Sequence, residues 1–157
     1  MTTLNERIDT TLPIEAAFDY VADFANSEEW DPGVESAERL DDGPVGVGSR
    51  YRLGVRLGSR VAPMEYRITE FERPRRVVLV GEGSGVSAVD DIRFEPAPTG
   101  GTRIDYTADI RLGGLLRLAQ PFLGGAFANV ARKAADGMRR TLAERAQAGW
   151  ADPAARR

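Results

Sequence analysis

The chain has 157 residues, of which 42% are hydrophobic and 29% are charged, and its formal net charge is −3. That length predicts one domain with a buried core. The chain contains no cysteine and no histidine, which excludes a thiol nucleophile, a disulfide, a Cys/His zinc site and an imidazole base. Any catalysis would depend on carboxylates, tyrosines, arginines or bound water.

The charge is unevenly distributed. Residues 1–110 contain 12 basic and 21 acidic residues, whereas residues 111–157 contain 9 basic and 3 acidic ones. The acidic balance argues against a nucleic-acid partner. No apolar run approaches the roughly 20 residues that span a bilayer, and the N-terminus lacks the basic and apolar regions of a signal peptide. The expected location is therefore the cytoplasm.

The first elements are a strand and a helix. Leu4, Glu6 and Ile8 alternate with polar neighbours, which predicts a strand from Thr3 to Thr11. Residues 12–34 then read LPIEAAFDYVADFANSEEWDPGV. Pro13 suits the first helical position, and the apolar residues that follow share one face at helical spacing. The pattern breaks at residues 25–27, continues as a second short helical turn and ends at Trp30-Asp31-Pro32-Gly33.

Six further strands are predicted, separated by turns rich in glycine, proline and aspartate. They are Glu35–Leu40, Ser49–Leu57, residues 60–71, Arg76–Val80, Ser87–Glu95 and Thr102–Leu112. The last has the longest alternation, with apolar and polar side chains on opposite faces. Strands of this length with short turns indicate an antiparallel meander with one face in water.

A long helix closes the chain. After Gly113-Gly114, residues 115–120 form a helical turn or two, and Pro121 either kinks or restarts the helix. Apolar residues then mark one helical face as far as about residue 147. Arg132, Lys133, Arg139 and Arg140 lie mainly on the other face. That basic face predicts a solvated surface, peripheral contact with an anionic membrane or contact with an acidic partner. Residues 149–157 are expected to be a disordered tail.

Three stretches carry a family resemblance: the helical segment at 12–34, YRITEFERP at 66–74 and FEPAPTGGTRIDYT at 94–107. Together with the element order, they resemble the START-like (SRPBCC) superfamily, which includes polyketide cyclase/dehydrase-like, coenzyme-Q-binding and birch-pollen-allergen-type proteins. The resemblance covers nearly the whole chain. It implies an α+β helix-grip domain over residues 1–148. In that fold a curved antiparallel sheet of about seven strands wraps around a long C-terminal helix, and two short helices follow the first strand.

The resemblance also implies a function. It predicts a cavity between sheet and helix that binds a small hydrophobic molecule: a lipid, polyketide, isoprenoid or aromatic metabolite. The alternatives are a polyketide cyclase or dehydratase that uses carboxylate and tyrosine acid–base groups, and a protein-interaction regulator. No cofactor and no metal are expected, and the oligomeric state is left open.

The expected ligand-binding residues lie on the concave sheet face, on the long helix and near the cavity entrance. They are Trp30, Tyr51, Leu53, Met64, Tyr66, Val78, Val80, Ile92, Ala108, Leu123, Phe127, Val130, Ala134 and Met138. The same set also describes a filled core. Trp30 is equally consistent with a pocket wall and with a plug beneath the helix–loop corner.

Asp90 is the sharpest polar candidate, because alternation places it on the face of Ile92 and Phe94. A carboxylate facing an apolar interior must be hydrogen-bonded or its pKa rises, and a raised pKa suits a general acid or base near neutral pH. Asp90 and Tyr106 are therefore the candidate catalytic pair. A bulge that turned Asp91 inward, or a structural ion pair, would remove this role.

Overall fold

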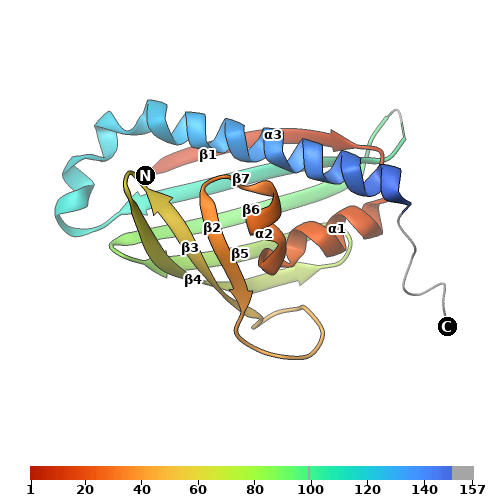
Figure 1. Cartoon of the computed structure of the whole chain (residues 1–157), viewed down its shortest axis with the longest axis horizontal. Helices are drawn as coiled ribbons and strands as arrows, with labels where there is room; N and C mark the ends of the chain where they lie inside the picture. The colour runs from red at the N-terminus through yellow and green to blue at the C-terminus, as the bar shows by residue number, and fades with distance from the viewer. Residues whose placement is uncertain (99, 150–157) are drawn as a thin grey trace.

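The computed structural model describes residues 1–98 and 100–149. Seven strands form one antiparallel sheet in the order β1-β7-β6-β5-β4-β3-β2. The strands are β1 (Thr2–Thr10), β2 (Val34–Arg39), β3 (Arg50–Leu57), β4 (Arg60–Glu72), β5 (Arg76–Gly83), β6 (Val86–Pro96) and β7 (Thr102–Leu112). The sheet curves beneath one long helix (Figure 1), so the predicted α+β helix-grip fold is confirmed.

The helices occupy two places in the chain. Between β1 and β2 lie α1 (Ile14–Ala22), the 3₁₀ turn η1 (Phe24–Asn26) and α2 (Ser27–Trp30). After β7 come the 3₁₀ turns η2 (Gly114–Leu118) and η3 (Gln120–Phe122), and then α3 (Gly124–Ala148). None of the described helices is long and apolar enough to cross a membrane. Of the predicted tail, residues 150–157 lie outside the described residues.

Register determines which side chains share the concave face. The first strand pairs with the last, so that Leu4 is opposite Ala108 and Glu6 is opposite Tyr106. On the other side of β7, Ala108 is opposite Asp90. Directly opposed residues in an antiparallel pair point to the same face of a sheet. These side chains from β1, β7 and β6 therefore lie together on the face that α3 covers.

One end of the concave face is a solid core built by α1. The Phe18 ring packs edge-on between Phe71 and Phe94, with ring centroids 5.2 and 5.0 Å away. Ile92 and Ile104 are fully buried in the same cluster. Aromatic pairs of this geometry add stability beyond their buried area. The α1 end of the sheet therefore has its interior filled by side chains.

The C-terminal half of α3 is fixed to the short helices. Gly137 lies directly against the backbone carbonyl of Trp30, where a β-carbon would collide with it. Met138 and Leu142, which follow Gly137 on α3, are buried. One turn further on, Arg145 stacks 3.9 Å from the centroid of the Tyr20 ring. Close backbone approach and buried apolar side chains fix this half of α3 against the rest of the fold.

The connection from β7 to α3 is held mainly by Gln120. Its Oε1 accepts the Leu112 N–H at 3.2 Å, and its Nε2 donates to the Ile110 carbonyl at 2.8 Å. Around it, three large apolar side chains are 73–87% exposed: Leu115, Leu118 and Phe122. Exposed apolar groups of this kind are what a protein-interaction role would use, and that role stays a prediction.

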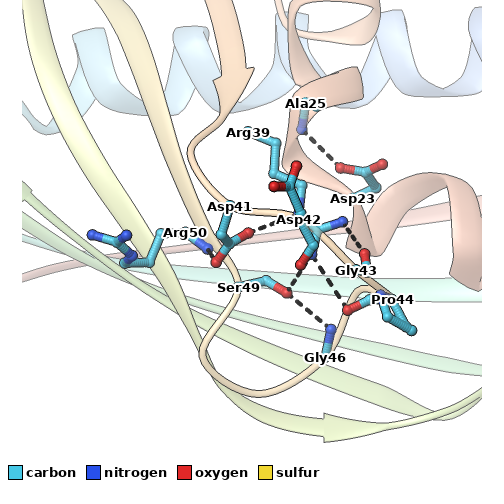
Figure 2. A network of polar contacts seen from close by, with 10 residues as sticks. All are labelled: Asp23, Ala25, Arg39, Asp41, Asp42, Gly43, Pro44, Gly46, Ser49 and Arg50. Carbon is cyan, nitrogen blue, oxygen red and sulfur yellow. Dashed lines mark hydrogen bonds and ion pairs between the residues drawn. The ribbon is translucent and has the colours of Figure 1, made fainter.

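The long β2–β3 loop is organised by Arg39 (Figure 2). Its guanidinium donates to Asp41 Oδ1 at 2.8 Å and to the Gly43 carbonyl at 2.6 Å, and it also reaches Ser49 Oγ. Asp41 in turn accepts the Arg50 backbone N–H. One planar cation with several donors thus ties both ends of the loop together, which leaves β3 correctly placed beside β2.

Candidate functional site

A cavity of about 170 Å³ lies between the sheet, the η1–α2 corner and the middle of α3. Its wall on α3 includes three alanines, Ala131, Ala134 and Ala135. Because alanine reaches only a short way toward the sheet, it leaves space that a leucine or phenylalanine would fill. The remaining wall is largely apolar and aromatic, and the cavity lies beyond the part of the concave face that α1 fills.

Asp90 and Tyr106 form the polar centre of this cavity. The Tyr106 hydroxyl donates to Asp90 Oδ2 at 2.7 Å. The two residues come from neighbouring strands, with Asp90 on β6 and Tyr106 on β7. Asp90 is only 6% exposed, and no other hydrogen bond to its carboxylate is made by the described residues. Its other oxygen is thus available to a ligand.

Burial raises the pKa of Asp90 from its ordinary 3.8 to about 7, because the ionised form loses its hydration. The negative charges of Asp31 and Asp109 raise this pKa further, while the Tyr106 hydrogen bond opposes the rise. Burial also raises the pKa of Tyr106 well above its ordinary value. Asp90 therefore exchanges a proton near neutral pH, whereas Tyr106 keeps its own.

Four further polar residues line the cavity: Glu6, Ser27, Asp31 and Tyr66. Burial raises the pKa of Asp31, although its Oδ1 accepts the Gly33 N–H at 2.7 Å. Burial also raises the pKa of Tyr66, and the charges of Asp90 and Asp31 add to that rise. The Tyr66 hydroxyl makes no hydrogen bond with any described residue. These groups concentrate acidic and hydroxyl chemistry in one small space.

Nine of the sequence-predicted residues line the cavity. From the sheet and the η1–α2 corner come Trp30, Leu53, Tyr66, Asp90, Tyr106 and Ala108. From α3 come Val130, Ala134 and Met138. Asp91, the alternative to Asp90, points away and forms an ion pair with Arg76 at 3.0 Å. Ligand binding by the nine stays a prediction.

Val78 and Val80 do not line the cavity, because the predicted phase of β5 is wrong. Gly81 of β5 lies opposite Tyr66 and against its ring, and Leu79 lies opposite Asp90. Residues 77, 79 and 81 therefore face inward, and Val78 and Val80 face the other side. Residues 77–80 are all large and apolar, so the sequence offers no alternation from which to read the phase.

Five other predicted residues also lie outside the cavity wall: Tyr51, Met64, Ile92, Leu123 and Phe127. The first three are buried in the solid core, where Tyr51 packs beside Phe24. Leu123 and Phe127 are half-buried at the start of α3, ahead of the turn that reaches the cavity. The apolar helix face that the sequence predicts extends further toward the N-terminus than the part of α3 that covers the sheet.

Sequence reasoning missed a dozen lining residues. Those from β1 and the first corner are Leu4, Glu6, Ile8, Phe24, Ser27 and Asp31. The others are Val34, Val55, Ala88, Ile110, Ala131 and Ala135. The alternation of Leu4, Glu6 and Ile8 was a usable signal, but it does not reveal that β1 pairs with β7. Asp31 precedes Pro32 and accepts a turn hydrogen bond from the Gly33 N–H, and it also lines the cavity.

Comparisons with known proteins agree with the fold. The family model described as "Polyketide cyclase / dehydrase and lipid transport" matches residues 1–144. No curated protein sequence matches the chain. Among solved structures, the ZhuI aromatase/cyclase from Streptomyces sp. R1128 superposes with a TM-score of 0.77 at 15% identity, covering 95% of this chain and 98% of that one.

Two further structures show the same fold. A START superfamily protein from Mycobacterium smegmatis has a TM-score of 0.76 at 12% identity, with coverage of 90% and 97%. A conserved protein from Geobacillus kaustophilus has a TM-score of 0.69 at 18% identity, with coverage of 92% and 97%. At such low identities the structures support the fold alone, whereas the family model spans nearly the whole sequence. The chain therefore belongs to the polyketide cyclase/dehydrase and lipid transport family.

Proposed function

We propose that this protein binds a small, mainly apolar molecule between the sheet and α3, with the polar group of the ligand toward Asp90 and Tyr106. The observation that carries the proposal is the cavity itself, which is largely apolar and has the hydrogen-bonded pair Asp90 and Tyr106 on its wall. Small-molecule sites typically combine an apolar wall with a few placed polar groups. The family description, which includes both cyclases and lipid transport, supports the same reading.

The volume of the cavity limits the size of the ligand that it can enclose. An engineered protein cavity of about 150 Å³ holds benzene, and this one has about 170 Å³. A single aromatic ring with a short chain is therefore the expected size of the enclosed part. Val130 lines the cavity and is 50% exposed, so a longer ligand would leave the cavity past this side chain.

A buried donor on the wall supports the presence of a ligand. Trp30 is 3% exposed and lines the cavity, and its Nε1 has no hydrogen-bond partner among the described residues. A buried donor without an acceptor costs free energy. A hydroxyl or carbonyl oxygen on the bound molecule, or a water that accompanies it, would satisfy this group.

The test uses phenylpropanol as a defined probe and compares two substitutions on α3. Ala134→Phe fills the cavity, whereas Ala128→Phe adds the same volume at an exposed position outside it. Isothermal titration calorimetry should show binding to the unmodified chain and to Ala128→Phe, and at least tenfold weaker binding to Ala134→Phe. Equal affinities for the two variants, or no binding to the unmodified chain, would contradict the proposal.

Acid–base catalysis is the second candidate, and the Asp90–Tyr106 hydrogen bond favours it. A carboxyl group whose pKa is near 7 can both accept and return a proton at neutral pH. Cyclisation and dehydration of a polyketide need such transfers at carbon next to a carbonyl. Ionised Asp90 would take that proton, and the enolate oxygen would receive a hydrogen bond from a hydroxyl of the cavity wall.

The catalytic candidate has a simple readout that needs no natural substrate. Benzylacetone is a ketone of suitable size, and NMR in D₂O follows replacement of its α-hydrogens by deuterium. The unmodified chain should accelerate the exchange above the buffer rate, and Asp90→Asn should remove the acceleration. Acceleration that survives Asp90→Asn, or none at all, would leave ligand binding as the only supported function.

A further inference from the structure

The charged side chains that line the cavity are all acidic. Among the described residues, its wall contains three carboxylates, Glu6 from β1, Asp31 from the corner after α2 and Asp90 from β6, and no arginine or lysine. From α3 it receives only valine, alanine and methionine side chains. The other titratable groups on the wall are the hydroxyls of Tyr66 and Tyr106. Nothing in this cavity compensates the charge of a fatty acid or another anionic ligand, which three carboxylates would repel.

Aromatic rings surround the same space. Phe24 packs against Trp30 and Tyr66, with ring centroids 6.3 and 5.4 Å away. Trp30 in turn packs against Tyr106, with centroids 6.0 Å apart. All four rings line the cavity. The faces of aromatic rings attract cations, and cages of such rings are the usual recognition site for ammonium groups.

Three oxygen atoms on the cavity wall have no hydrogen-bond donor among the described residues. Asp90 uses one carboxylate oxygen for Tyr106, and Asp31 uses one for the Gly33 N–H. The second oxygen of each, together with the hydroxyl of the 92%-buried Tyr66, has no hydrogen-bond donor among the described residues. An ammonium group has donors and no acceptor, so it matches these oxygens in number and in sign.

We propose that the ligand of this cavity is an apolar amine, whose ammonium group lies between Asp31 and Asp90 against the surrounding rings and whose ring or short chain fills the alanine-lined space under α3. This inference rests on the proposed function and adds the chemical class of the ligand. Neutral alcohols of the same shape bind more weakly, and carboxylates bind weakest.

Proton release accompanies amine binding. Asp90, whose pKa is about 7 in the fold, ionises when the cation arrives. At pH 6.5 to 7, calorimetry in two buffers of different ionisation enthalpy should show protons leaving the complex when the amine binds. Binding of the alcohol should release none.

The test compares phenylpropylamine, phenylpropanol and phenylpropanoate, which share one scaffold and differ in the terminal group. At pH 7.5 the amine should bind at least about tenfold more tightly than the alcohol, since a hydrogen bond to a charged group exceeds a neutral one by about that factor. Asp90→Asn and Asp31→Asn should each reduce the amine-to-alcohol ratio. Asp42→Asn, in an exposed turn, should leave the ratio unchanged.

The outcomes separate this inference from the function on which it rests. If the alcohol binds and the amine is no tighter, or if both cavity variants retain the full ratio, the amine assignment is wrong and ligand binding stands. Tightest binding of the carboxylate would also overturn the amine assignment. If none of the three molecules binds, both proposals fail.

Discussion

Replacing Asp90 by asparagine should stabilise the protein, and the gain should grow with pH. The pKa of Asp90 rises from 3.8 in an exposed chain to about 7 in the fold, so the folded state holds one more proton than the unfolded state between these values. Stability contributed by this group is complete below pH 3.8 and is lost as pH rises through 7. Asparagine cannot ionise, and it therefore avoids the loss.

The size of the stability change follows from the shift in the pKa of Asp90. At 1.36 kcal/mol per pKa unit, the raised pKa of Asp90 lowers the free energy of unfolding, relative to its value at low pH, by about 2 kcal/mol at pH 5, where Asp90 is ionised only in the unfolded state, and by about 4 kcal/mol at pH 8. A constant term of about 1 kcal/mol, from the altered hydrogen bond with Tyr106, applies at every pH. The difference in unfolding free energy between Asp90→Asn and the unmodified chain should therefore increase by about 2–3 kcal/mol from pH 5 to pH 8.

Urea denaturation at four pH values between 5 and 8 measures this difference. Asp42→Asn is the matched control, because it removes an exposed carboxylate from a turn outside the cavity. If the stability difference for Asp90→Asn stays constant within about 0.5 kcal/mol, Asp90 is solvated in the folded state and the argument from burial is wrong.

Two further predictions concern α3 and its connection. Gly137→Ala should destabilise the fold by about 1–3 kcal/mol in urea, because the added carbon meets the Trp30 carbonyl. Gly124→Ala, where a β-carbon has open space, should be neutral or slightly stabilising, and equal effects would contradict the packing argument. Gln120→Leu should cost about 1–3 kcal/mol by leaving the Leu112 N–H without its acceptor, and should speed hydrogen exchange at residues 113–123. The exposed Gln147→Leu is its control, and unchanged exchange in Gln120→Leu would show that the glutamine does not hold the connection.

The sequence predicted the element order because each element has its own local signal. Alternation in residues 102–112 and helical spacing after residue 123 are both long enough to be read without knowing their partners. Asp90 was placed on the inner face by the same alternation. The relation between β1 and β7 was not predictable in this way, since pairing between residues about a hundred positions apart leaves no local trace.

The cavity wall was harder to predict than the fold for a different reason. Whether an inward-facing residue lines empty space or fills the core depends on what covers it. Ile92 and Asp90 share a face, yet Ile92 lies in the core that α1 helps to fill and Asp90 lies where α3 presents alanines. The sequence identifies the face, whereas the division of that face between core and cavity depends on where helices separated in the chain come to lie.

The two halves of α3 differ in burial, and this difference affects how the protein can evolve. The half that contains Gly137 and Leu142 is buried against the rest of the fold, whereas most of residues 124–133 are exposed. Substitutions in residues 124–133, the N-terminal half of α3, can alter the width and lining of the cavity near Val130. The contacts that hold the domain together persist, because they are made by the C-terminal half. A lineage can thus acquire new ligands by mutating one exposed helical segment, without first acquiring the extra stability that core changes would require.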